Sequence, residues 1–105
     1  SRAKQLAETM VEIGNKAGVK TVALITQMDT PLGNAVGNAL EVSESIDVLN
    51  GKGSTDQENV VCANASLAIA ISKDVSIIEA FNQAKESIKT KNALKCFNDL
   101  INIMK

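Results

Sequence analysis

Residues 57–71, QENVVCANASLAIAI, are the most apolar stretch of the chain. Apolar side chains fill most positions after Asn59, so a helix formed here has little polar surface on any face. We therefore predict a helix over residues 57–71 that is buried at the centre of the fold, with the other elements packed around it.

Capping residues predict where three helices begin. Thr55 with Glu58 has the spacing of a capping box before helix 57–71, and Ser76 with Glu79 repeats that spacing before a fourth helix. Thr90 is expected to cap the last helix. The last two helices each have an apolar face, formed by Ile77, Phe81, Ala84 and Ile88 and by Leu94, Phe97, Ile101 and Met104.

The N-terminal half predicts two further helices. In the first, apolar residues recur every three or four positions, and Gly18 then suits a left-handed cap. The residues of this apolar face are Ala3, Leu6, Ala7, Met10 and Ile13. A second helix is expected from about Asn34 to Asn50, after the turn residues 29–33.

Residues 21–26, TVALIT, are β-branched and apolar without polar alternation, a pattern typical of a strand covered on both faces. A lone strand leaves its N–H and C=O groups unpaired. Either a second strand exists in the chain, or strand 21–26 pairs with another chain, or it belongs to a larger sheet. The predicted fold is mostly α with one α/β crossover, about five helices and one strand, in a single compact domain of residues 1–105.

Composition excludes several classes of function. The net charge is −1 and basic residues form no stripe, so we expect no nucleic-acid partner. Apolar runs are too short for a membrane span and no signal peptide is evident, so we expect a cytoplasmic protein with no membrane partner. Cys62 and Cys96 are expected to be buried free thiols.

The chain contains no histidine, tyrosine or tryptophan. A Ser-His or Cys-His nucleophile pair is therefore impossible within it, and acid–base chemistry falls to Asp, Glu or Lys. Two cysteines and carboxylates are a poor ligand set for zinc, which we reject. From the residues alone we assign no catalytic residue and no residue that binds an organic cofactor.

Residues 2–49 resemble pyrimidine-nucleoside (thymidine) phosphorylases. The resemblance is found in AETMVEIG at residues 7–14, KTVALIT at 20–26, Met28-Asp29, and the specific blocks PLG at 31–33 and AVGNALEV at 35–42. It implies a pentosyltransferase whose fold belongs to the nucleoside phosphorylase and phosphoribosyltransferase superfamily.

Residues from about 48 to 105 look more like the C-terminal part of anthranilate phosphoribosyltransferase. The matching runs are VLNGKG at 48–53, NVVCANA at 59–65, AKES at 84–87 and Ala93-Leu94. The resemblance implies one shared fold, with a seam near 48–55. The chain is then either a chimera or a natural relative intermediate between the two families.

The chain departs from both families' patterns. Gln27 stands where the phosphorylases usually have an acid, Asn34 where they have a basic residue, and residues 90–94 replace a Ser-Gly-Lys-Ala-Leu pattern. The Gly-rich loop that holds phosphate in these families through backbone N–H groups has no counterpart, since Gly51-x-Gly53 is a weak match. The base-binding segment and the paired-acid magnesium motif are also missing.

One partial site follows from the resemblance. Phosphorylases of this family hold a potassium ion partly through two backbone carbonyls and a carboxylate. Matched position by position, these ligands are the carbonyls of Leu32 and Ala35 and the side chain of Glu44. Oxygen ligands of this kind suit a hard cation. The structural alternative is that Glu44 is a solvated carboxylate on a helix.

Three functions remain open. The chain is an incomplete or chimeric piece of a pentosyltransferase without activity alone; or a small helical interaction module that forms a homo-oligomer through the orphan strand or the apolar helix; or a pentosyltransferase that is active only when a partner chain completes it.

Overall fold

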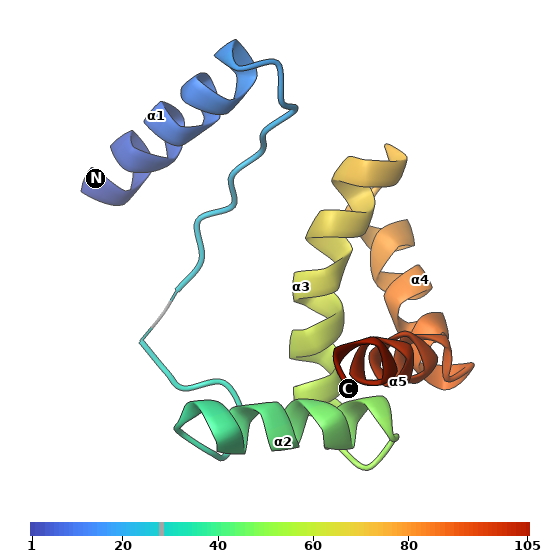
Figure 1. Cartoon of the computed structure of the whole chain (residues 1–105). Coiled ribbons are helices and arrows are strands. Elements are labelled where there is room, and N and C mark those ends of the chain that lie inside the picture. Colours follow the sequence, from blue (N-terminus) through green and yellow to red (C-terminus); the bar gives the residue numbers. More distant parts are fainter. Residues whose placement is uncertain (28) are drawn as a thin grey trace. The chain divides into compact units, whose positions relative to one another are not determined.

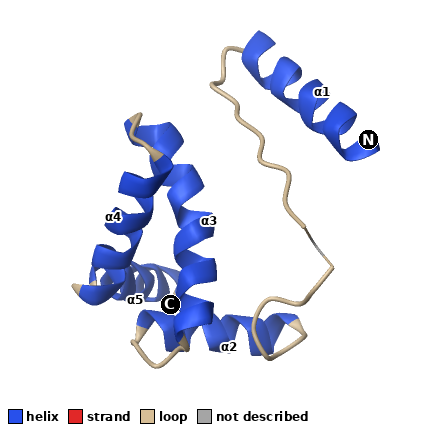
Figure 2. Ribbon diagram, turned by 180° about the vertical axis from the view of Figure 1, so that it is seen from behind, coloured by secondary structure: helices blue, strands red, loops and turns tan. Residues whose placement is uncertain are grey.

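The computed structural model describes residues 1–27 and 29–105. These residues form five helices joined by loops (Figures 1 and 2). The helices are α1 (Arg2–Lys16), α2 (Asn38–Leu49), α3 (Thr55–Lys73), α4 (Ile77–Lys89) and α5 (Asn92–Met104). The chain divides into two compact units, Ser1–Thr30 and Pro31–Lys105, whereas we expected one domain; the expected seam at 48–55 falls inside the second unit. Met28, part of the quoted resemblance, lies outside the described residues.

In the first unit, α1 ends as its sequence predicts. Gly18 adopts φ +80° and its N–H donates to the carbonyl of Asn15 at 3.0 Å. The N–H of Val19 donates to the carbonyl of Gly14, also at 3.0 Å. These two bonds form a Schellman motif, and the left-handed conformation at its centre favours glycine.

The predicted strand at residues 21–26 is wrong for the structure, which has no strand in its described part. Val22, Leu24 and Ile25 are 56–70% exposed, and the N–H of Thr21 donates to the Asn15 side chain at 3.1 Å. The physical reason is that a strand needs a neighbour to accept its backbone hydrogen bonds, and the described residues supply none. The α/β crossover that we predicted is therefore not formed.

The second unit is built on the packing of α3 against α4. Its core contains Val48 from α2, Cys62 from α3, and Ala84 and Ile88 from α4. Half-buried apolar side chains pack against this core: Val61, Ala65, Ile69 and Phe81. Helix α3 is less enclosed than we predicted, because only Cys62 and Ser66 are buried along it.

Two of the three predicted helix starts need correction. The capping box of α3 joins Ser54 to Gln57, one residue before the predicted Thr55 and Glu58. Thr90 ends α4, and Lys91, with φ +65°, precedes α5. Ser76 caps α4 as predicted, because its hydroxyl accepts the N–H of Glu79 at 3.1 Å.

Helix α2 begins at Asn38, four residues after the predicted start. Gly33 and Gly37 both have positive φ, +79° and +124°, which a right-handed helix does not allow. The helix ends at Leu49, and Gly51, also with positive φ, lies in a second Schellman motif after it.

No single helix in the described part of the chain is both long and apolar enough to cross a membrane. Helices α3 and α4 are long and apolar enough only when they are taken together, and the chain bends by 116° at the break between them.

Gly53 lies where the loop after α2 returns over that helix. A Cβ on Gly53 would lie 2.5 Å from Cγ2 and 3.1 Å from Cα of Val48. We predict that Gly53→Ala lowers the free energy of unfolding by about 1–3 kcal/mol, because the buried Val48 has no room to move. Urea denaturation measures this change. Lys52→Ala, at an exposed neighbouring position, should stay within about 0.5 kcal/mol of the parent chain; equal effects would contradict the prediction.

The two cysteines differ in their surroundings, whereas we expected both to be buried. Cys62 is buried and Cys96 is exposed. Burial raises the pKa of the Cys62 thiol, and the Glu58 carboxylate raises it further, although Lys85 lowers it. We predict that a thiol reagent such as DTNB labels Cys96 rapidly near pH 8 and labels Cys62 only when the second unit opens. Labelling of Cys96→Ser as fast as that of the parent chain would contradict this.

Candidate cation site

The candidate site joins the turn at residues 31–36 to α2. Pro31 and Gly33 shape this turn, Pro31 by fixing φ and Gly33 by adopting φ +79°. Glu44 lies two turns into α2, half-buried, and its side chain reaches back to the turn. All of these residues belong to the second unit.

The Glu44 carboxylate is held by two donors on one oxygen. The N–H of Asn34 donates to Oε1 at 3.0 Å, and Nε2 of Gln57 donates to the same atom at 3.1 Å. The other oxygen, Oε2, accepts no hydrogen bond from the described residues. It lies against Gly33, where an added Cβ would come within 2.5 Å of it. The turn therefore fits the carboxylate closely only because residue 33 is glycine.

The structure brings Glu44 to the turn that contains Leu32 and Ala35. The side chain of Leu32 is 60% exposed, and Ala35 is half-buried. Among the described residues, neither carbonyl accepts a hydrogen bond from another part of the chain. Two carbonyl oxygens and one carboxylate oxygen form a donor set suited to a hard cation. The assignment of these three residues as ligands stays a prediction.

Gln57 is the contact of Glu44 that the sequence analysis did not predict. The Ser54-x-x-Gln57 spacing fits the capping-box pattern as well as Thr55-x-x-Glu58 does, and choosing it would have pointed to this side chain. Its contact with Glu44, thirteen residues away, has no local signal in the sequence. Within the described residues, no group of three or more acidic, cysteine or histidine side chains is placed to hold a metal.

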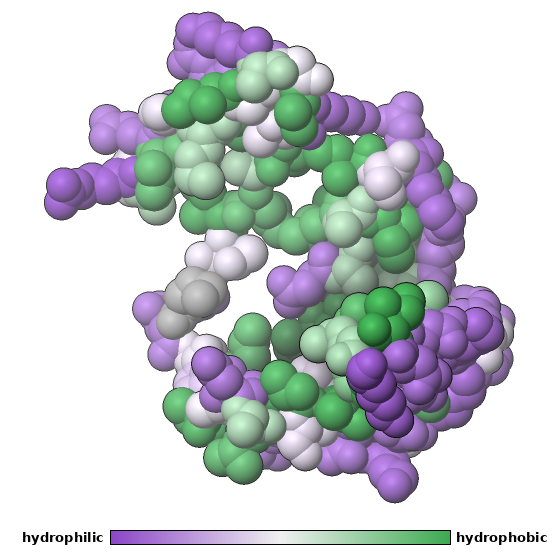
Figure 3. Space-filling model, viewed as in Figure 1, coloured by the Kyte–Doolittle hydropathy of each residue, from purple (hydrophilic) through white to green (hydrophobic). Residues whose placement is uncertain are grey.

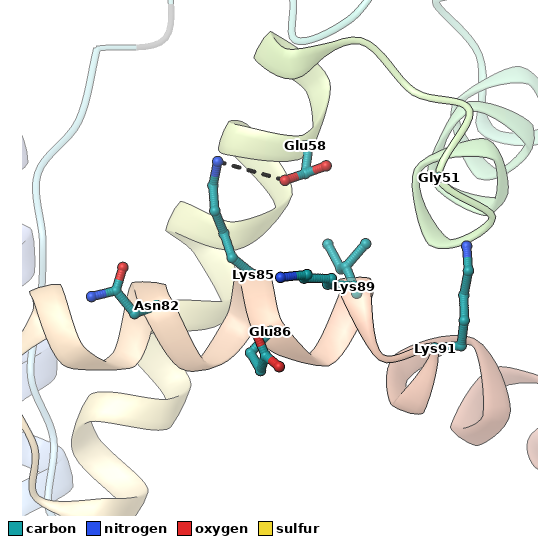
Figure 4. A pocket seen from close by; sticks show the side chains of 8 residues that line it. Gly51, Glu58, Asn82, Lys85, Glu86, Lys89 and Lys91 are labelled. Atoms are coloured by element: carbon teal, nitrogen blue, oxygen red, sulfur yellow. Dashed lines mark ion pairs between the residues drawn. The ribbon is translucent and has the colours of Figure 1, made fainter.

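An open groove of about 490 Å³ lies where α4 meets the Gly51 turn and α3 (Figure 4). Lys85 points to Glu58, with 3.5 Å between Nζ and Oε1, and Nζ of Lys91 donates to the carbonyl of Asn50 at 2.8 Å. Both lysines therefore join helices within the chain. We place the candidate site at Glu44 and not in this groove.

A substitution at Gly33 tests how closely the turn fits Glu44. We predict that Gly33→Ala displaces the carboxylate, because the added Cβ occupies the position next to Oε2. The Asn34 amide then loses its acceptor and exchanges its hydrogen with solvent roughly tenfold faster, as expected for the loss of one charge-assisted bond. Hydrogen exchange followed by NMR measures this change.

Gly18→Ala is the matched control. Gly18 has φ +80° and nothing within 4 Å of an added Cβ, so this variant has the same backbone strain, about 1–2 kcal/mol, without the clash. Asn34 exchange should be unchanged in this variant. Equal acceleration in both variants would refute the proposed fit.

Comparison with known proteins identifies the family. The model described as "Glycosyl transferase family, a/b domain" matches residues 1–94. The pyrimidine-nucleoside phosphorylases of Geobacillus stearothermophilus and Bacillus subtilis (strain 168) are 42% and 41% identical over 100 residues. That of Staphylococcus haemolyticus is 40% identical over the same length. Each match covers 94% of this chain and 23% of the relative. The comparison with solved structures gives no match.

These matches extend across the expected seam, since a 100-residue alignment includes residues on both sides of position 50. One family therefore accounts for both halves of the chain, and a second parent stays a hypothesis. The chain spans less than a quarter of its relatives' length, 23%. It belongs to the glycosyl transferase family, a/b domain, as a piece that is similar to pyrimidine-nucleoside phosphorylases.

Proposed function

We propose that this chain is a part of a nucleoside phosphorylase-type pentosyltransferase that contributes to a potassium site and has no turnover by itself. The observation that carries the proposal is the contact between Glu44 and the turn at residues 33–34. This contact brings together two parts of the chain that the resemblance assigns to one cation site.

The geometry of the turn supports a cation rather than a merely solvated carboxylate. Oε1 of Glu44 is occupied by two hydrogen bonds, which leaves Oε2 available beside Gly33. Leu32 directly precedes that glycine in the sequence, and Ala35 follows it by two residues. A bound potassium ion would supply positive charge between these oxygens and so tie the turn to α2.

The glycines that most resemble a phosphate loop have structural roles. Gly51 forms the left-handed end of α2, and Gly53 lies against Val48 with no room for a side chain. Pentosyl transfer develops positive charge on the sugar and negative charge on the leaving base, and both charges need preorganised partners. We assign Glu44 to the cation and assign no described residue to either of these charges, and this supports a contributing rather than a complete site.

The test is phosphorolysis of thymidine and uridine by the purified, folded chain with phosphate and potassium chloride. We predict no release of free base above a protein-free blank. Release that is proportional to chain concentration and lost in Glu44→Ala would overturn the proposal, because the chain would then contain a complete active site. Circular dichroism of the parent chain and of Glu44→Ala shows whether each is folded.

A second candidate function is an interaction module, which one observation favours. No described residue of the first unit is buried, and large apolar side chains lie on its surface (Figure 3). These include Leu6, Met10 and Ile13 on α1 and Val22, Leu24 and Ile25 in the segment that follows. Exposed apolar groups of this extent favour association, either of two copies or with a partner chain that completes the enzyme.

Light scattering at increasing protein concentration separates these alternatives. A stable dimer would favour the interaction module, whereas a monomer at high concentration would count against it. Phosphorolysis by a mixture with a longer family member that exceeds the activity of that member alone would favour completion by a partner chain.

A further inference from the structure

We infer that Gln57 is a positioning residue of the cation site, which holds the Glu44 carboxylate so that Oε2 faces the turn. The inference rests on the proposed function, because it concerns the same site. It goes beyond that function because Gln57 lies on α3, whereas Glu44 lies on α2, and Gln57 is not itself one of the proposed ligands.

The side-chain amide of Gln57 is fixed at both ends. Its oxygen accepts the N–H of Ser54 at 2.9 Å, and its Nε2 donates to Oε1 of Glu44 at 3.1 Å. An amide oxygen cannot donate, so the bond from Ser54 determines which end of the amide faces Glu44. The capping box of α3 therefore sets the direction of the donor that reaches the site.

This arrangement orients the carboxylate. The N–H of Asn34 and the amide of Gln57 both donate to Oε1, which directs the second oxygen, Oε2, to the position beside Gly33. Because Gln57 is neutral, Glu44 supplies the only carboxylate among these contacting side chains. A single negative charge suits a monovalent cation, since sites for divalent calcium gather several carboxylates.

The cap that the Ser54 hydroxyl supplies and the positioning role of the Gln57 side chain can be separated. The hydroxyl of Ser54 accepts the backbone N–H of Gln57 at 3.2 Å, a bond that does not involve the glutamine side chain. Gln57→Met removes the donor to Glu44 at similar volume and similar helix propensity. Ser54→Ala weakens the cap but leaves the amide of Gln57 in place. The Glu44 carboxylate therefore loses a hydrogen-bond donor in Gln57→Met and keeps it in Ser54→Ala.

The experiment uses NMR of the full chain and has two readouts. The first is hydrogen exchange of the Asn34 amide without potassium, which we expect to be roughly tenfold faster in Gln57→Met than in Ser54→Ala. The second is titration with potassium chloride against choline chloride at equal ionic strength, followed through the amides of residues 33–36. We expect potassium binding to weaken at least threefold in Gln57→Met and to be unchanged in Ser54→Ala.

The two proposals fail in different ways. If the parent chain shows no shift specific to potassium, the cation site is refuted. If Asn34 exchange is the same in Gln57→Met and Ser54→Ala, the positioning role is refuted, whatever potassium does. Should Gln57→Met unfold, Gln57→Glu replaces it, because glutamate keeps the capping box but cannot donate at neutral pH. Unchanged Asn34 exchange in Gln57→Glu would refute the role equally.

Discussion

The close packing of α3 against α4 is the interaction on which the second unit depends. The residues at this contact are small, and Cys62, Ser66 and Ala80 are almost completely buried. A chain with two phenylalanines and no tryptophan or tyrosine has few large side chains to fill a core. Small side chains let two helices pack closely, and this also fills the core without large side chains. The buried hydroxyl of Ser66 is satisfied because it donates to the carbonyl of Ala63 at 2.7 Å.

This packing positions the candidate site through α2. Val48 is 2% exposed and belongs to the core, and Glu44 precedes it by four residues, so both lie on the same face of the helix. Burying Val48 therefore fixes the rotation of α2 and the direction in which Glu44 projects. The Gly53 backbone covers Val48, and one residue later Ser54 starts α3. The site residue Glu44, the core residue Val48 and the loop residue Gly53 therefore lie within one short segment of the chain.

The sequence predicted the features that depend on neighbouring residues. The left-handed cap at Gly18 and the cap at Ser76 were correct because each needs only a few adjacent backbone groups. The start of α2 was placed too early, because the prediction of a helix from about Asn34 did not include the positive φ that Gly37 adopts. Glu44 was named from family resemblance, but its partner Gln57 was not, because contacts between helices leave no local pattern.

The strand predicted at residues 21–26, which the structure does not form, shows where sequence patterns fail. Its apolar, β-branched residues are typical of a strand buried on both faces, and the described residues of the chain do not provide that burial. A strand depends on neighbours that supply its hydrogen bonds, whereas a helix satisfies its own backbone. The described contacts of Glu44 lie entirely within residues 31–105. The contacts of Glu44 therefore form without a strand at residues 21–26. A strand there would need a neighbouring strand to accept its hydrogen bonds, whereas the candidate cation site needs only residues of the second unit.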